Sequence, residues 1–244
     1  TDSAAAATTM FTGVKTFRGS ILMDLDVFPL KAIIDYAEEC GKRTGTVTSV
    51  QASHATPAAF AAHNISRNNY EEIGEHLLDS DFDYFAGGGF RVNKYKSDEY
   101  ADKSNEERYA IVESKAVDKG FTFANTRAEF DVLKRRDGRV IAINPYLDSS
   151  NAIPYALNRM AADGPGEEYD GSISLAEFTK KGIKLLKNRK GFFMMVEGGK
   201  IDWACHANDA RAAIEDTIAF DDAISVAVKF AKRHPYETLI VVTG

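Results

Sequence analysis

Five apolar residues run directly into a carboxylate and two glycines in the stretch Phe192-Phe193-Met194-Met195-Val196-Glu197-Gly198-Gly199. An apolar run of this length, followed by glycines, is typical of a strand that is buried on both faces. Such strands occur in parallel sheets that are covered by helices. Because ligands bind beyond the carboxyl ends of parallel strands, Glu197 and the residues after it are the first candidates for a functional site.

The rest of the chain alternates between strand-length apolar runs and amphipathic helical patterns. This alternation predicts an α/β fold, namely a three-layer αβα sandwich with a mainly parallel central sheet. The segment 91–170 is more polar, and we interpret it as a peripheral excursion from the sheet, with a loop at Asp163–Gly166. Further strands are predicted at Thr44–Val50, Tyr84–Ala86, Val140–Ile143 and Thr238–Thr243. Helices are predicted at Leu30–Glu39, Glu71–Leu78, Glu106–Lys119, Leu175–Lys187 and Ala210–Lys232. In the last helix, Ile214, Ile218, Ile224 and Val228 fall on one apolar face, and Asp221 beside it is expected to be buried.

The composition excludes several classes of protein. With 244 residues, of which 44% are apolar and 27% charged, the chain has the make-up of a globular domain with a large core. No apolar run is long enough to span a membrane. A net charge of −6 argues against a general nucleic-acid binder, because phosphate backbones attract clustered Lys and Arg. The two cysteines, Cys40 and Cys205, make no disulfide framework.

The first candidate motif is Thr1-Asp2-Ser3-Ala4-Ala5-Ala6-Ala7-Thr8. Four alanines after Ser3 predict the start of a helix. In one interpretation, Ser3 is only the N-cap of that helix. In the other, Ser3 is a nucleophile at a helix N-terminus, where free N–H groups and the helix dipole favour an anionic substrate.

The second candidate motif follows the strand at 44–50 and contains His54, Thr56 and Pro57. The Thr-Pro pair predicts a helix with Thr56 as its N-cap, and Arg67 would lie about three turns further on. Arg67 is either a solvated surface residue or a bidentate clamp for phosphate or carboxylate. His63, on the same alanine-rich stretch, is expected to be structural.

The third candidate motif is Glu197-Gly198-Gly199-Lys200-Ile201-Asp202-Trp203-Ala204-Cys205-His206. Asp202 and His206 offer a carboxylate and an imidazole, which suit zinc, whereas a carboxylate with a hydroxyl suits magnesium. Glu197 would be a charge without a partner at the end of a buried strand unless a cation bound it. We expect Cys205 to be a packing residue, and His76 and His234 to lie on the surface.

Together these motifs resemble the alkaline phosphatase family. That family has a Thr-Asp-Ser-Ala-x-x-Ala-Thr motif followed by Thr-Gly-x-Lys-Thr, matched by Thr1–Thr8 and Thr12–Thr16. Its Asp/His-Ala-Thr-Pro-Ala motif and downstream Arg match His54–Ala58 and Arg67. Its Val-Glu-Gly-x-x-Ile-Asp-x-x-x-His motif matches Val196–His206, and its Gly-Gly-Gly matches Gly87–Gly89. The motifs occur in order along most of the chain.

The resemblance implies a role for each matching residue. Ser3 would be the catalytic nucleophile that becomes phosphoserine, and Arg67 the catalytic and substrate-binding phosphate clamp. Asp202 and His206 would bind one zinc ion, and Thr56 and Glu197 would bind magnesium. His54 and Trp203 would contact substrate beside the third metal. The implied reaction is hydrolysis of a phosphate monoester by two zinc ions and one magnesium ion.

The resemblance also implies ligands that these residues do not supply. The family has an Asp-Gly motif before the nucleophile, an Asp-His pair after the strand that here ends Val241-Val242-Thr243-Gly244, and a further His. The second zinc therefore lacks all its protein ligands here. We expect the sequence to be an incomplete domain, inactive or nearly so alone and active only within the full-length protein.

Two alternative functions remain open from the sequence. One is a phosphodiesterase of the same superfamily, although Thr56, Glu197 and Arg67 favour a monoesterase. The other is a non-catalytic folded fragment that binds a metal or an anion weakly. The resemblance further implies small phosphomonoester substrates, no specific binding of nucleic acid, no membrane span, a homodimer, and a periplasmic or extracytoplasmic location.

Overall fold

The central sheet has five parallel strands in the order β3-β4-β2-β1-β5 in the computed structural model, which describes residues 2–159 and 169–244. Strand β1 pairs with β2 on one side and with β5 on the other. Along β5 the register runs from Arg43 opposite Phe192 to Thr48 opposite Glu197. The carboxyl ends of β1 and β5 are therefore level, as the fold class predicted. The strands are β1 (Arg43–Thr48), β2 (Tyr84–Gly87), β3 (Phe121–Ala124), β4 (Arg139–Ile143) and β5 (Phe192–Glu197).

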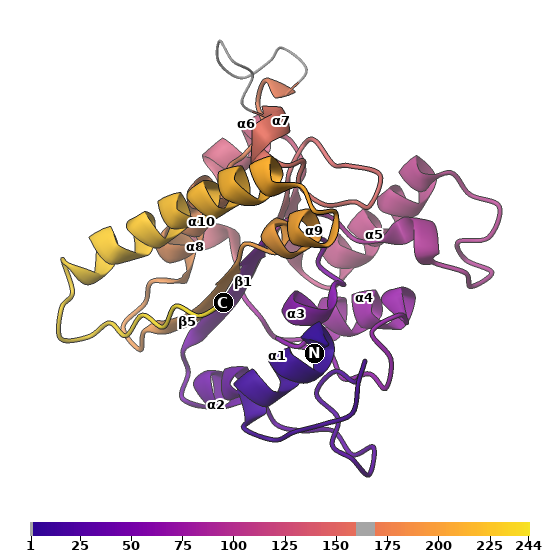
Figure 1. Cartoon of the computed structure of the whole chain (residues 1–244), viewed down its shortest axis with the longest axis horizontal. Helices are drawn as coiled ribbons and strands as arrows, with labels where there is room; N and C mark the ends of the chain where they lie inside the picture. Colours follow the sequence, from indigo (N-terminus) through magenta and orange to yellow (C-terminus); the bar gives the residue numbers. More distant parts are fainter. Residues whose placement is uncertain (1, 160–168) are drawn as a thin grey trace.

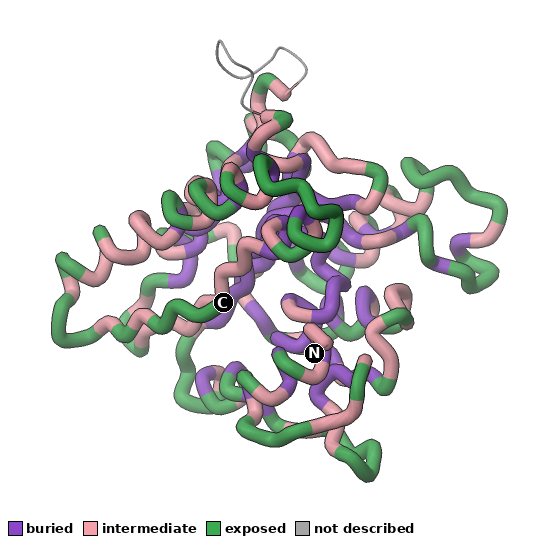
Figure 2. Tube along the Cα trace, viewed as in Figure 1, coloured by how far each residue is buried: buried purple, intermediate pink, exposed green. Residues whose placement is uncertain are grey.

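Helices cover both faces of the sheet (Figure 1). Alternate residues of the strands point to opposite faces: Phe85 and Ile141 join one apolar cluster, and Tyr84 and Val140 join the other. The first cluster contains residues of α1 to α5, and the second contains residues of α6, α8 and α10. The buried trace follows the sheet between these two layers (Figure 2). The predicted three-layer αβα sandwich is thus confirmed.

Local capping signals explain where several helices begin. The side chains of Ser104, Thr126 and Ser174 each accept a hydrogen bond from the backbone three residues later, and a glutamate at that position closes a capping box. The α-helices are α1 (Ser3–Thr12), α2 (Ile33–Glu39), α3 (Ala55–Ala58), α4 (Tyr70–Asp79), α5 (Asn105–Asp118), α6 (Arg127–Val132), α7 (Ala156–Arg159), α8 (Leu175–Leu186), α9 (Lys200–His206) and α10 (Ala210–Ala231).

Two expectations about the sheet differ from the structure. The segment 91–170 supplies β3 and β4 to the sheet as well as its peripheral turns, while the predicted loop at Asp163–Gly166 lies outside the described residues. The predicted strand Thr238–Thr243 is irregular, and its Leu239 is 87% exposed. A strand needs a hydrogen-bonded neighbour to be stable, and no ladder joins this segment to another strand in the described part of the chain.

The predicted apolar face of α10 is buried only in part, since its residues Ile224 and Val228 are half-buried. Ile214 and Ile218 are exposed, whereas Ala212, Asp216 and Ala223 are buried. The helix packs on α8 and α9, and its Phe220 packs against the apolar cluster on that side of the sheet. Asp221 is exposed, and the buried carboxylate is Asp216, which accepts a hydrogen bond from the N–H of Ala156.

Across residues 2–159 and 169–244, no helix is both long and apolar enough to cross a membrane.

The loops after three strands, β1, β2 and β4, are tied together by backbone hydrogen bonds. The N–H of Ala52 donates to the carbonyl of Gly89, whose own N–H donates to the carbonyl of Asn151, each at 2.8 Å. This close approach requires glycine at position 87, which has a φ of +136° and where a Cβ would lie 1.8 Å from the Thr48 carbonyl oxygen.

We expect Gly87→Ala to lower the free energy of unfolding by about 3 kcal/mol, because backbone would have to move to admit the methyl group. Urea titration of both proteins measures this change. Gly138→Ala is the matched control: Gly138 also has positive φ, at +78°, but open space around its Cβ position. That variant should lose only about 1 kcal/mol. Equal losses in the two variants would contradict the close-approach argument.

Candidate active site

Ser3 is the first residue of α1, and Asp2 precedes it as the N-cap. Oδ1 of Asp2 accepts a hydrogen bond from the N–H of Ala5 at 3.1 Å, so the interpretation of Ser3 as the N-cap is wrong. Asp2 is a favourable N-cap because its carboxylate accepts hydrogen bonds from first-turn N–H groups and lies at the positive end of the helix dipole. The Ser3 side chain is left at the N-terminus of the helix and is half-buried.

Arg67 is held between Asp2 and His54. Its Nη1 lies 3.0 Å from Oδ2 of Asp2, and its Nη2 donates to Nε2 of His54 at 3.2 Å. Gly19 joins the same group, because its N–H donates to Oδ1 of Asp2 at 2.8 Å and its carbonyl accepts from the N–H of Arg67 at 2.7 Å. The guanidinium is thereby fixed beside the start of α1.

The sequence predicted a helix about three turns long between Thr56 and Arg67. The structure does not have this helix. The helix α3 covers only Ala55–Ala58, and it begins one residue before Thr56, with His54 in the N-cap position. Pro57 is in the first turn, where its missing N–H costs nothing. Arg67 belongs instead to an irregular segment held by the carbonyl of Gly19.

His54 is buried and uncharged. Burial, followed by the positive charges of Arg67 and Arg91, lowers the pKa of its imidazole from 6.5 to about 3. Because Arg67 donates to Nε2, the ring proton must sit on Nδ1. Nδ1 is buried and has no hydrogen-bond partner in the described part of the chain. Asp2 has the opposite character: burial raises its pKa, but hydrogen bonds from Gly19 and Ala5 and the charge of Arg67 outweigh this and lower the pKa.

The helix α9 brings Trp203 to His54. The two rings meet edge to face, with centroids 5.6 Å apart and an interplanar angle of 68°. One turn apart on the same helix, Asp202 and His206 place Oδ1 and Nε2 3.4 Å from each other, and both side chains are exposed. Cys205 is exposed as well, so the expectation that it packs in the core is wrong. A seven-residue helix at the surface leaves its outer side in water.

Glu197 lies at the end of β5 and is bound by hydroxyl groups. The hydroxyl of Thr48, its register partner on β1, donates to Oε2 at 2.6 Å. Burial raises the pKa of Glu197; the hydroxyls of Thr48 and Thr56 oppose this rise, and the charge of Asp202 adds to it. Thr56 is thus brought close to Glu197 and Asp202, which belong to a distant part of the chain.

The donor atoms fit the metals that the resemblance implies. A buried carboxylate next to a hydroxyl is a site of hard oxygen donors, and a bound magnesium ion would remove the cost of burying the charge of Glu197. Asp202 and His206 offer the oxygen and nitrogen that zinc accepts. Within residues 2–159 and 169–244, no three side chains of His, Cys, Asp or Glu come together as a metal-binding group.

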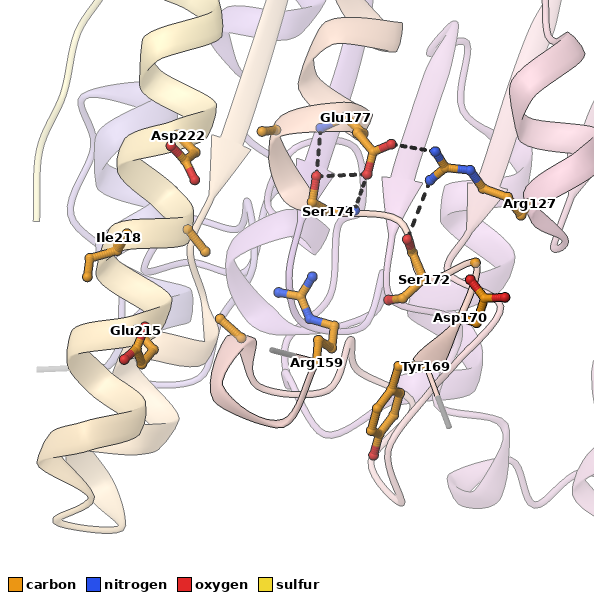
Figure 3. Close-up of a pocket in the computed structure, with 14 residues that line it drawn as sticks. Arg127, Arg159, Tyr169, Asp170, Ser172, Ser174, Glu177, Glu215, Ile218 and Asp222 are labelled. Atoms are coloured by element: carbon orange, nitrogen blue, oxygen red, sulfur yellow. Dashed lines mark hydrogen bonds and ion pairs between the residues drawn. The ribbon is translucent and has the colours of Figure 1, made fainter. Parts of the chain in front are cut away.

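A separate cavity lies elsewhere. It has a volume of about 490 Å³ and opens between α7, α8 and α10 (Figure 3). Arg159 points into it, and Arg127 at its edge pairs with Glu177. None of the predicted site residues lines it. Outside the site, His63 bonds to the carbonyl of Leu30, which confirms its structural role, while His76 is exposed and His234 half-buried.

Comparison with known proteins decides the family, because residues 1–244 match the alkaline phosphatase family throughout. The chain belongs to the alkaline phosphatase family. Alkaline phosphatase 3 of Bacillus subtilis is 35% identical over 245 residues, which is 100% of this chain and 48% of that protein. Alkaline phosphatase of Escherichia coli is 30% identical over 275 residues, with 100% of this chain and 57% of that protein covered.

Solved structures of the family share the fold. A cold-active alkaline phosphatase from Shewanella sp. superposes with a TM-score of 0.78 and 33% identity, over 96% of this chain and 51% of that one. A histidine-to-glutamate variant of the alkaline phosphatase of the Antarctic bacterium TAB5 has magnesium bound in its M3 site. It matches with a TM-score of 0.72 and 29% identity, over 96% and 60% of the two chains. The chain spans about half the length of the curated relatives it matches.

Sequence reasoning missed three residues of this site. Asp2 was quoted within the motif, but its pairing with Arg67 was not foreseen, although an Asp directly before a helix is a signal for an N-cap. Gly19 and Thr48 carry no such signal. Their roles arise because a loop and a strand end, both distant in sequence from their partners, meet at the same edge of the sheet.

The depressed pKa of His54 predicts a specific loss of stability in acid. Below about pH 6.5 the unfolded chain binds a proton at this residue, whereas the folded chain does so only near pH 3, so stability falls as pH falls through this window. Replacing His54 with neutral Gln removes this contribution. We expect the stability advantage of the wild type over His54→Gln to shrink by up to ~1.4 kcal/mol per pH unit below about pH 6. Urea unfolding at several pH values measures it, and parallel curves would disprove it.

Proposed function

We propose that these residues form part of an enzyme that hydrolyses phosphate monoesters through a phosphoserine at Ser3. The observation that carries the proposal is the placement of Arg67. Its guanidinium is fixed beside Ser3 at the N-terminus of α1 by Asp2 and His54. A planar cation next to a helix N-terminus is suited to the oxygens of a phosphoryl group. Membership of the alkaline phosphatase family supports the same reaction.

In the proposed reaction, Oγ of Ser3 attacks phosphorus, the P–O bond of the ester breaks, and the leaving alcohol takes up a proton. Water then attacks the phosphoserine, which releases inorganic phosphate and restores Ser3. Arg67 binds the non-bridging oxygens throughout, because negative charge on them must be balanced in both steps. Neutral His54 accepts from Arg67 without competing for the anion, and Trp203 holds the imidazole in place.

Metal ions complete this proposal. When bound, zinc and magnesium supply Lewis-acid activation of the serine and of water. Asp202 and His206 would hold one zinc ion, and Thr56 and Glu197 would contribute to the magnesium site. The solved variant of the TAB5 enzyme, with magnesium in its M3 site, supports metal binding in this family. The pairing of Glu197 with threonine hydroxyls favours a monoesterase with this third metal over a phosphodiesterase.

The family resemblance also supports proposals about context. We propose small phosphomonoesters as substrates, a homodimer as the assembly of the full-length protein, and a periplasmic or extracytoplasmic location. We further propose that residues 1–244 alone are nearly inactive, because the residues that match the family motifs provide only part of its ligand set.

The phosphoserine is tested by trapping it in the complete enzyme. After acid quenching with a ³²P-labelled monoester, the wild type should carry label and Ser3→Ala should carry none, with turnover lowered about a thousandfold or more. Thr12→Ala, which removes a hydroxyl at the other end of α1, is the control and should keep both properties. Label that persists in Ser3→Ala would disprove the assignment of the nucleophile.

The inactivity of residues 1–244 alone is tested with p-nitrophenyl phosphate in the presence of zinc and magnesium. We expect less than about a thousandth of the turnover of the complete enzyme, since a metal site with too few ligands neither holds zinc nor activates the serine. Zinc analysis after dialysis is the parallel measurement. Zinc-dependent turnover comparable to that of the complete enzyme would refute this proposal.

A further inference from the structure

Lys200 is a buried lysine at the first position of α9. The residue is 1% exposed, and its ammonium lies 2.6 Å from Oδ2 of Asp148. The same ammonium lies over two aromatic rings, 3.8 Å from the centroid of Tyr155 and 4.7 Å from that of Trp203. An ammonium is costly to bury, and here a carboxylate and two π faces compensate that cost.

Both ends of this lysine are fixed. Its backbone N–H donates to Oγ of Ser49, just beyond β1, at 3.0 Å. Its partner Asp148 is fixed as well, because Oδ1 accepts from the N–H groups of Ser150 at 2.8 Å and Ala152 at 3.1 Å. Asp148 therefore divides its oxygens between the turn after β4 and Lys200. The pair joins this turn rigidly to the start of α9.

The stability of the fold does not by itself require such a pair. Buried ion pairs can often be replaced by apolar residues of similar size without loss of stability, so we look for the role of this pair in the geometry that it fixes. The geometry concerned is that of Trp203, which lies three residues after Lys200 and on the same side of α9. The ring of Trp203 contacts His54 edge to face, and His54 accepts a hydrogen bond from Arg67.

We propose that the pair of Lys200 and Asp148 is a positioning element for the phosphate-binding group. It holds the ring of Trp203 against His54, and the imidazole in turn holds the guanidinium of Arg67 in place beside Ser3. Lys200 acts through these neighbours and does not touch the substrate. The part that concerns phosphate rests on the proposed function, whereas the part that concerns Trp203 does not.

The chain has one tryptophan, so its fluorescence reports on Trp203 alone. Lys200→Met keeps the length of the side chain and removes the charge; Asp148→Asn keeps the Oδ1 acceptor and weakens the pair. In both variants we expect acrylamide to quench Trp203 about twofold more strongly, because the ring is released from His54. Lys200→Arg, which keeps the charge, should retain most of the protection of Trp203 from acrylamide. Lys119→Met, at the exposed pair of Lys119 with Asp79, is the matched control and should behave as wild type.

A purely structural pair would give a different result. The variants would then melt at lower temperature while their folded forms, identified by circular dichroism, kept wild-type quenching; that outcome overturns the proposal. Asp148→Asn decides the question if Lys200→Met does not fold. In the complete enzyme, inorganic phosphate is the probe, and its inhibition constant should rise about tenfold in both variants. An active enzyme with an unchanged constant would overturn the link to Arg67, whereas a wild type without phosphatase activity would refute only the proposed function.

Discussion

The close approach of the loops that follow β1, β2 and β4 is the constraint on which the rest of the structure depends. It exists because Gly87 has no Cβ: a methyl group there would lie 1.8 Å from the carbonyl oxygen of Thr48. This contact allows two backbone hydrogen bonds to form between the loops, from Ala52 to Gly89 and from Gly89 to Asn151. The loop that carries His54 is thereby fixed relative to the sheet.

The candidate site follows from this frame. Strand β5 is in register with β1, so Glu197 lies beside Thr48 and the carboxylate is bound where the strands end. The helix α9 begins directly after it and reaches back over His54 with Trp203. From the other side, the N-terminus of α1 approaches the same loop. The ion pair of Asp2 with Arg67 joins the start of α1 to this part of the site.

Charge is distributed unevenly within this site. Net charge is −6, yet the group beside Ser3 presents a guanidinium and a neutral imidazole. A charged His54 would repel Arg67, and burial together with the nearby cations prevents this by lowering the pKa of the imidazole to about 3. Lys200, which is also buried, is neutralised by its pair with Asp148.

The sequence by itself determined many of the elements and the chemistry that their residues could carry, although it missed β3 and predicted a strand at Thr238–Thr243 that the structure lacks. Periodicity placed α8 and α10 within a residue or so of their observed ends, and the apolar run at 192–196 predicted β5. The ordered motifs indicated the family. Only the tertiary structure decided that Asp2 pairs with Arg67, that Thr48 binds Glu197, that Lys200 meets Asp148 and which side of α10 faces inward. These are contacts between distant segments, and they depend on strand register and side-chain volume, neither of which leaves a periodic signal in the chain.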